Sequence, residues 1–232
     1  MENKNVWHNV EQGSDDWFNL RLAQVTASKI SDIMAKTKSG YSTSRANYMA
    51  ELLNERLTGQ RKEGFTNANM ERGTTLEPIA RSAYEVFTGY TVETIGFIQY
   101  DGLAFGGSPD GVIERDAEGN ANSIEIKCPL ADNHWVTILA NEIPSQYRYQ
   151  LLGQLALTGG KWVDFVSFNN ELPEALQIKV IRFNRDELAI ADMLREIRLF
   201  LTELDELENK ALELISDGIN NDYLKFIQRE LF

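Results

Sequence analysis

Three charged residues near the middle of the chain have the types and the spacing to act together in chemistry. Asp110 lies in a Ser-Pro-Asp-Gly segment, and Glu125 and Lys127 follow it, two residues apart. Side chains two apart on a strand share a face, so Glu125 and Lys127 point to the same side. A hairpin turn near Glu118 and Gly119 would put Asp110 opposite Lys127 and diagonal to Glu125. Two carboxylates and a lysine would then converge, as at a site for a divalent metal and a phosphodiester.

The same residues also suit a structural role. Ser-Pro-Asp-Gly is good turn chemistry, and exposed strand faces often alternate charged with apolar residues. A single Glu-x-Lys carries almost no information, because both residues are abundant. The combination of this turn, the hairpin spacing and the apolar-Glu-apolar-Lys pattern is much rarer. Motifs elsewhere in the sequence decide between a catalytic site and a purely structural hairpin.

Composition narrows the possible classes. The chain has 232 residues, enough for one sizeable core, and we find no convincing linker, so we predict one domain over residues 1–232. One cysteine argues against disulfides and an iron–sulfur cluster, and two distant histidines argue against zinc. Carboxylates suit Mg²⁺ or Mn²⁺ better. We find neither a membrane span nor a signal-peptide pattern, and we expect a cytoplasmic protein without membrane attachment.

The net charge of −12 is unevenly distributed along the chain. Residues 1–72 hold ten Lys and Arg against nine Asp and Glu, whereas residues 73–232 hold thirteen against twenty-six. Binding to phosphates needs local positive potential rather than a basic protein. The charge therefore does not exclude a nucleic-acid partner.

Periodicity and turn residues predict the elements that must position these groups. We expect helices near 14–22, 27–35, 45–58, 74–88 and 144–158, and strands near 90–100, 103–107, 111–115, 123–128, 162–168 and 176–183. A long amphipathic helix follows over about 185–215, packed on the domain or forming a subunit contact. This order predicts an α/β fold with a mixed central sheet between helices, over about 11–185, and a C-terminal helical extension over about 186–232.

Three further polar residues could join the site. Glu77 lies in a Thr-x-x-Glu-Pro segment, which is also a capping box at a helix start; a third carboxylate could equally bind a metal. Gln150 and Gln154 stand one helical turn apart. They form either a solvent-facing polar stripe or, through Gln150, a contact with the attacking water or the scissile phosphate.

A second group lies near the N-terminus. Trp17 and Arg21 are one helical turn apart and precede Thr26-Ala27-Ser28. An arginine with hydroxyl donors at a helix N-terminus is a natural pocket for a terminal phosphate. The alternative is a core tryptophan beside a surface arginine.

Taken together, these motifs resemble those of the lambda-type alkaline exonucleases, the YqaJ-like viral recombinase family within the PD-(D/E)xK nuclease superfamily. The matching pieces occur in the family's order over about residues 11–185. They are Gln12-Gly13 through Trp17, Leu20-Arg21-Leu22, Thr26-Ala27-Ser28, Gly73 with Glu77, Ser108-Pro109-Asp110-Gly111, Glu125-Ile126-Lys127-Cys128-Pro129, and Tyr147 with Gln150.

The resemblance implies a restriction-endonuclease-like core and a Mg²⁺-dependent exonuclease. Such an enzyme digests one strand of duplex DNA from its 5′ end and leaves a 3′ overhang for phage-type recombination. Asp110, Glu125 and the Ile126 carbonyl would hold two Mg²⁺ ions, for which Mn²⁺ could substitute, and Glu77 would complete the set. Lys127 would orient or deprotonate the water, and Gln150 would assist.

The resemblance also implies how DNA is held. Arg21, Ser28 and Ser108 would form a 5′-phosphate pocket, with Trp17 near the terminal base pair. Family members form ring-like homotrimers and work beside a single-strand annealing protein. Where the family tends to have an arginine in the 36–45 loop, this chain has Lys38, with Arg45 further on. Lysine cannot make the same bidentate phosphate contact. The strength of DNA binding, and therefore the processivity, is in doubt.

Two alternatives to an exonuclease follow from the same residues. The catalytic hairpin alone does not determine where DNA is cut, so another endonuclease of the superfamily would carry it too. A non-catalytic DNA-binding subunit is the alternative from a different class, and the presence of Asp110, Glu125 and Lys127 argues against it.

Overall fold

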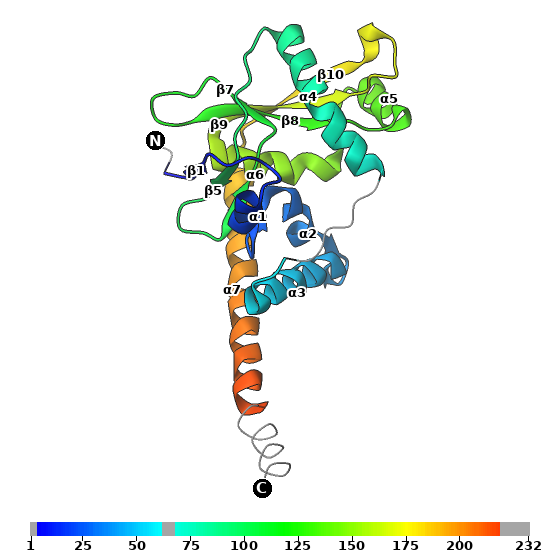
Figure 1. Ribbon diagram of the computed structural model, residues 1–232. Helices are drawn as coiled ribbons and strands as arrows, with labels where there is room; N and C mark the ends of the chain where they lie inside the picture. Colours follow the sequence, from blue (N-terminus) through cyan, green and yellow to red (C-terminus); the bar gives the residue numbers. More distant parts are fainter. Residues whose placement is uncertain (1–3, 62–67, 219–232) are drawn as a thin grey trace.

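A computed structural model describes residues 4–61 and 68–218 of the chain (Figure 1). Within those ranges the strands form two four-stranded sheets and one two-stranded hairpin. The sheet with the order β10-β9-β8-β7 carries the predicted catalytic segment, and β8 runs parallel to β9 while the other neighbours are antiparallel. The strands of this catalytic sheet are β7 (Gly111–Ile113), β8 (Ala121–Lys127), β9 (Gly159–Phe168) and β10 (Ile178–Asn184). The predicted mixed sheet is confirmed.

A second sheet has the order β1-β5-β6-β2. Its members are β1 (Val6–His8), β2 (Val25–Thr26), β5 (Phe97–Gln99) and β6 (Phe105–Gly107). Two of its strands, β5 and β6, were predicted as part of a single central sheet, and β1 and β2 were not predicted. The strand predicted over 90–100 is too long, because only its last part enters this sheet and Glu93 makes a single bridge to Val112. The hairpin of β3 (Lys36–Thr37) and β4 (Gly40–Tyr41) lies where a loop was expected.

Helices cover both faces of the catalytic sheet (Figure 1). Their bounds are α1 (Asp15–Arg21), α2 (Ile30–Met34), α3 (Thr43–Thr58), α4 (Ala68–Thr88), α5 (Ala131–Ala140), α6 (Arg148–Thr158) and α7 (Glu187–Gly218), with single 3-10 turns at Ala27–Lys29, Ser145–Tyr147 and Glu174–Leu176. Helix α5 was not predicted from the sequence. Across the described ranges, no helix combines the length and the apolar composition needed to cross a membrane.

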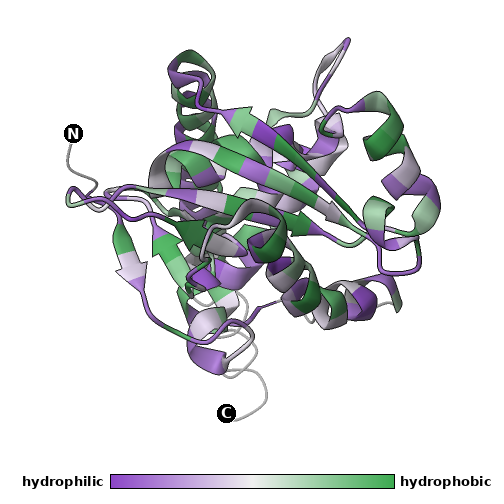
Figure 2. Ribbon diagram, turned by 90° about the horizontal axis from the view of Figure 1, so that it is seen from above, coloured by the Kyte–Doolittle hydropathy of each residue, from purple (hydrophilic) through white to green (hydrophobic). Residues whose placement is uncertain are grey.

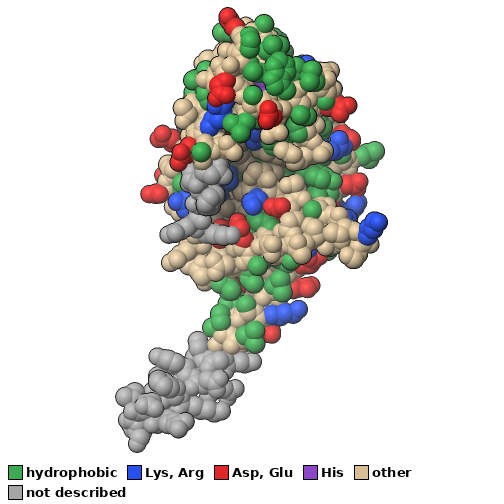
Figure 3. Space-filling view, turned by 90° about the vertical axis from the view of Figure 1, so that its right-hand side faces the viewer, with side chains coloured by type: hydrophobic (Ala, Val, Ile, Leu, Met, Phe, Trp, Pro, Cys, Tyr) green, Lys and Arg blue, Asp and Glu red, His purple; other side chains and the backbone are tan. Residues whose placement is uncertain are grey.

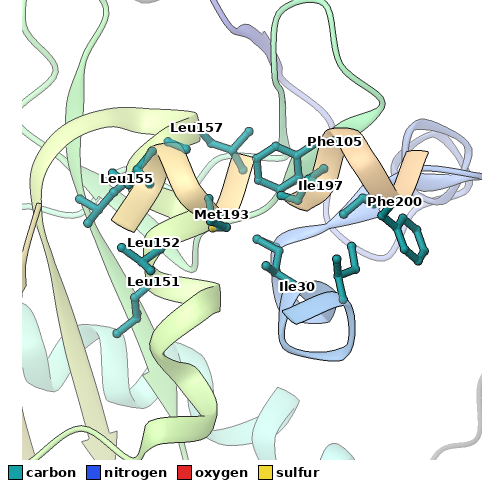
Figure 4. Close-up of a cluster of buried hydrophobic side chains, with 14 of the residues drawn as sticks. Ile30, Phe105, Leu151, Leu152, Leu155, Leu157, Met193, Ile197 and Phe200 are labelled. Atoms are coloured by element: carbon teal, nitrogen blue, oxygen red, sulfur yellow. The ribbon is translucent and has the colours of Figure 1, made fainter. Parts of the chain in front are cut away.

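The two faces of the catalytic sheet pack into different cores. Ala80 and Tyr84 of α4 pack with Ile124 and Ile126 of β8 on one face. Leu151 of α6 packs in a larger cluster with strand and helix residues on the other (Figure 4). Seen from above, hydrophobic and hydrophilic residues alternate along the strands and helices (Figure 2). As predicted from their alternation, the isoleucines of β8 face one core while Glu125 and Lys127 face the other way.

The long C-terminal helix was predicted nearly to its bounds. Its first half packs on the larger core through Ile190, Met193, Ile197, Phe200, Leu201 and Leu204, which are all buried. The second half extends away from the body of the protein (Figure 1), and there Leu207 and Leu214 are exposed. Packing on the domain is therefore confirmed for the first half, and a subunit contact stays a prediction for the second.

The helix that carries Glu77 begins earlier than predicted. It runs from Ala68 rather than from about Thr74, so Thr74 and Pro78 are interior residues. The proposed capping box at Thr74 is therefore wrong, because a capping box requires a helix end at that position. Glu77 instead projects from the middle of α4.

Candidate active site

The β7–β8 hairpin brings Asp110 next to β8. Gly111 pairs with Ile124, and continuing this register puts Asp110 opposite Glu125. The predicted pairing of Asp110 with Lys127 is wrong, because the observed register of β7 and β8 differs from the predicted one by two residues. β7 ends at Ile113, and Glu114 after it has a left-handed φ of 52°. The Asp110 carboxylate remains on the predicted spot: its Oδ2 accepts a hydrogen bond from the Ile126 N–H at 2.6 Å.

Glu125 lies at the centre of a network of hydrogen-bond donors. Its Oε1 accepts from Lys127 Nζ at 2.5 Å and from Gln150 Nε2 at 2.6 Å. Its Oε2 accepts from Gln154 Nε2. The side chain is almost fully buried, and the two glutamines both come from α6. The idea of a solvent-facing glutamine stripe is therefore wrong, because both amides point inward to Glu125.

Glu77 reaches the same region from α4. Its Oε1 accepts from Arg81 Nη2 at 2.5 Å, and Arg81 Nε donates to the Asp110 carbonyl at 3.1 Å. Arg81 therefore ties the third carboxylate to the hairpin. The sequence analysis missed Arg81, although its position one helical turn after Glu77 was a usable signal.

Glu77, Asp110 and Lys127 open onto a common pocket of about 370 Å³, and Glu125 touches it only through Lys127. It is lined by Asn69, Gly73, Glu77, Asp110, Ile126, Lys127, Cys128, Pro129 and Tyr147. Figure 3 views the molecule from the side on which β8 ends and α4 begins, and it shows a recess across this face with acidic and basic side chains inside.

Burial and mutual repulsion shape the charges of the site. Burial, together with the charge of Glu125, raises the pKa of Asp110 well above its usual value. Burial also raises the pKa of Glu77, although Arg81 opposes the shift. Burial lowers the pKa of Lys127, but Glu125 and Asp110 outweigh it and hold that pKa above its usual value. Lys127 is therefore a positive charge between carboxyl groups.

The donor chemistry suits a hard divalent cation. Within residues 4–61 and 68–218, no three His, Cys, Asp or Glu side chains already form a metal-binding cluster. The carboxyl-bearing residues Glu77 and Asp110 nevertheless line one pocket with Ile126, whose carbonyl is a further oxygen donor, and Glu125 touches Lys127 at its wall. Carboxylate and carbonyl oxygens are the ligands that Mg²⁺ prefers. The residues present therefore fit this metal.

The N-terminal group forms a second, smaller pocket of about 220 Å³. Arg21 and Ser28 line it, as do Lys29 and Arg61, which the sequence analysis did not select. Glu51 and Glu55 lie in the same wall, so the pocket is mixed in charge rather than purely basic.

Trp17 connects this pocket to the catalytic hairpin. The Arg21 guanidinium lies 4.1 Å from the centre of the Trp17 ring, and Trp17 Nε1 donates to Ser108 Oγ at 2.9 Å. Ser108 precedes Asp110 by two residues. The predicted phosphate-binding residues and the predicted catalytic aspartate are therefore physically linked.

The two residues predicted to hold DNA through the 36–45 loop differ in their surroundings. Lys38 is exposed, between β3 and β4. Arg45 is 5% exposed, donates through both terminal nitrogens to Glu203, and lies 4.1 Å from the centre of the Tyr41 ring. The DNA contact predicted for Arg45 conflicts with this placement, because its guanidinium is enclosed and already paired.

Fold and site together define a class of protein, because a mixed α/β sheet with helices on both faces brings the carboxyl groups of Asp110, Glu125 and Glu77 and the Lys127 ammonium group into one region, as expected of a nuclease. Residues 16–161 match the family described as the YqaJ-like viral recombinase domain, and the chain belongs to that family.

Comparisons with individual proteins agree with this assignment. A search of the curated proteins finds no match. Among solved structures, the alkaline exonuclease LHK-Exo from Laribacter hongkongensis is 38% identical, with a TM-score of 0.80 over 88% of this chain and 99% of that one. A structure of LHK-Exo in complex with dAMP gives 39% identity and a TM-score of 0.79 over the same shares. A phage-related exonuclease from Haemophilus somnus 129PT, 15% identical, shares the fold, with a TM-score of 0.58 over 83% and 96% of the chains. The predicted family and enzyme class, a DNA exonuclease, are confirmed.

Proposed function

We propose that this chain is a Mg²⁺-dependent 5′→3′ exonuclease, which removes one strand of linear duplex DNA and leaves a 3′ overhang for phage-type recombination. The observation that carries the proposal is that Asp110 and Lys127 line one pocket and that Glu125 contacts Lys127 directly. Membership of the recombinase family supports it. Its substrate is a DNA end, and its place of action is the cytoplasm of a bacterial host.

Each residue of the pocket has a role that follows from its surroundings. Asp110, Glu125, the Ile126 carbonyl and Glu77 would hold the Mg²⁺ ions, or Mn²⁺ in their place. When bound, two such ions activate water and stabilise the leaving oxygen of a phosphodiester. Glu125 and Asp110 keep the pKa of Lys127 above its usual value when no metal is bound, whereas a neighbouring metal ion would lower it. We assign Lys127 the role of orienting the water and stabilising negative charge, and a role as general base is the alternative.

Gln150 would assist the reaction through its hydrogen bond to Glu125. Its amide donates to the same oxygen of Glu125 as Lys127 does, and its side chain is only partly buried. An amide in that position orients the carboxylate and can also turn to the attacking water. This assisting role agrees with the one implied by the family.

The pocket around Arg21 would bind the 5′-phosphate. Arg21, Ser28 and Lys29 supply a charged fork, a hydroxyl and an ammonium group, and all three line the pocket. Phosphate suits such donors. Trp17 stacks against Arg21 and could offer a surface to the terminal base pair, while Ser108 holds the Trp17 indole. Lys38 would contact the DNA backbone further along.

The assembly is also part of the proposal. By analogy with the family, the active form would be a homotrimer that encircles DNA and hands its product to a single-strand annealing protein. A ring would keep the enzyme on its substrate, which matters because Lys38 offers a weaker contact than arginine.

One digestion experiment tests the activity. A linear duplex with 5′-phosphoryl ends, the same duplex with 5′-hydroxyl ends and a closed circle are incubated with the enzyme and Mg²⁺, with chelator as control. The proposal expects rapid loss of the 5′-phosphorylated strand and an intact circle. Cutting of the circle would instead identify an endonuclease, and no cleavage with Mg²⁺ or Mn²⁺ would identify a non-catalytic DNA-binding protein.

A further inference from the structure

Gln154 is a fully buried side chain beside the catalytic carboxylates, and neither the motif nor the proposed reaction accounts for it. It lies on α6 one turn after Gln150, with 0% of its surface exposed. Its Nε2 donates to Glu125 Oε2, and its Oε1 accepts from Ser123 Oγ at 3.5 Å. Ser123 is also fully buried and precedes Glu125 by two residues on β8, so both face α6.

We propose that Gln154 is a positioning residue that anchors one oxygen of Glu125 and thereby presents the other to the metal pocket. The inference rests on the proposed function, because it assigns a task to Glu125 as a metal ligand. It adds a residue that does not itself touch the pocket: Gln154 is absent from the lining, whereas Lys127 belongs to it.

The two oxygens of Glu125 have different surroundings. Oε2 meets only the buried amide of Gln154 among the contacts of the described residues. Oε1 meets Lys127, which lines the pocket, and Gln150, which is partly exposed. Glu125 itself is absent from the lining, but its Oε1 lies against Lys127, which is part of it. Oε1 is therefore the oxygen that a cation in the pocket would reach, and Oε2 is the one that Gln154 would hold in place. The Gln150 side chain is only partly buried, and we infer that its amide turns away when a cation reaches Oε1.

An amide is chemically suited to this task. A buried carboxylate needs hydrogen-bond donors, because leaving it without partners is costly. A neutral amide supplies a donor and leaves the negative charge available to a cation. An arginine or lysine in its place would add a second positive charge to the one that Lys127 already brings to Glu125, and would compete with the metal. Ser123 fixes which way the amide points, because its hydroxyl donates to the amide oxygen.

Removal of the amide should weaken metal binding rather than DNA binding. Partners that orient a metal ligand from behind typically contribute about 10–100-fold to affinity. In Gln154→Met, which keeps the size and removes the donor, we expect Mn²⁺ to bind about tenfold more weakly or worse in calorimetry without DNA. The Mg²⁺ concentration for half-maximal digestion should rise by a similar factor, while KM for DNA ends stays unchanged and excess Mg²⁺ restores kcat.

Thr158→Val is the matched control. Thr158 is equally buried on the same helix, one turn further on, and its hydroxyl accepts from the Gly160 N–H at 3.3 Å. Its substitution removes a buried polar group from α6 without removing a donor to Glu125. We expect Thr158→Val to keep the wild-type affinity for Mn²⁺, even if it lowers the midpoint of thermal unfolding as Gln154→Met does.

Wild-type metal affinity in Gln154→Met would overturn the inference, as would an equal loss of affinity in Thr158→Val. If Gln154→Met does not fold, Gln154→Asn withdraws the same amide by one methylene and is judged by the same comparison. Failure of the wild-type protein itself to bind Mn²⁺ or to cleave DNA would refute the proposed function, a result separate from either outcome for Gln154.

Discussion

Replacing Glu203 with alanine should destabilise the protein more than replacing Arg45 with methionine, although the two side chains form one ion pair. Arg45 is 5% exposed and Glu203 is 36% exposed. Without Arg45, the carboxylate of Glu203 can be hydrated, and methionine fills the space beside the Tyr41 and Phe200 rings. Without Glu203, the guanidinium of Arg45 stays buried and loses both of its carboxylate contacts.

The expected magnitudes follow from this asymmetry. Removing the partner of a deeply buried charge costs about 3–5 kcal/mol, and the exposure of Glu203 reduces that figure. We expect the free energy of unfolding to fall by about 2–3 kcal/mol in Glu203→Ala and by about 1 kcal/mol in Arg45→Met. Urea denaturation measures both, and Glu206→Ala, an exposed neighbour on α7, should change it by less than about 0.5 kcal/mol.

The same variants test the structural role of Arg45 against the DNA contact implied by the family. Arg45→Met should bind DNA ends as the wild-type protein does, at a salt concentration where binding is measurable. Unchanged stability together with clearly weaker DNA binding would refute the reasoning. It would mean that the guanidinium leaves Glu203 when DNA arrives.

The remaining predictions concern single residues. Asp110→Asn should lower the rate of cleavage by about a hundredfold or more, with wild-type unfolding, since it removes a charge from the metal pocket; digestion assays and circular dichroism measure the two effects. Lys127→Met should also inactivate without unfolding, and a merely twofold loss in the same assays would make Lys127 structural. Arg21→Met should reduce the preference for 5′-phosphoryl over 5′-hydroxyl ends about tenfold, because a charged hydrogen bond contributes about 1.5–3 kcal/mol. If the variant keeps the wild-type preference in digestion assays, the 5′-phosphate binds elsewhere. His134→Leu should lower the free energy of unfolding, measured in urea, by about 2–4 kcal/mol. The reason is that the Ser167 hydroxyl and the Leu176 carbonyl, which lie 2.7 and 2.9 Å from the ring nitrogens of His134, lose their hydrogen-bond partner inside the protein. Wild-type stability would show that these two groups form hydrogen bonds with other partners.

Local pattern was enough for the elements whose signal is long or repeated. The period of the apolar residues in α7, the turn chemistry around Asp116 and the isoleucines alternating with Glu125 on β8 each predicted an observed feature. Short strands such as β1 were missed, because three residues are too few to show a period. The start of α4 was misplaced, because a Thr-x-x-Glu-Pro segment reads as a helix start even where the helix runs through it.

Side-chain partners between distant segments could not be read from spacing. Nothing near Gln154 in the sequence indicates that it faces Glu125, 29 residues away, and nothing near Arg45 indicates Glu203, 158 residues away. Arg45 was assigned to DNA because its loop suited that role, and the packing of α3 against α7 enclosed it instead.

The sequence by itself determined which groups can do the chemistry: the carboxylates, the lysine and the arginine are set by residue type, and strand alternation fixes which of them share a face. Only the tertiary structure decided which of these groups are free to act. Hydrogen bonding and burial depend on which helices cover the sheet, and those contacts turned one glutamine into a buried anchor and one arginine into a structural ion pair.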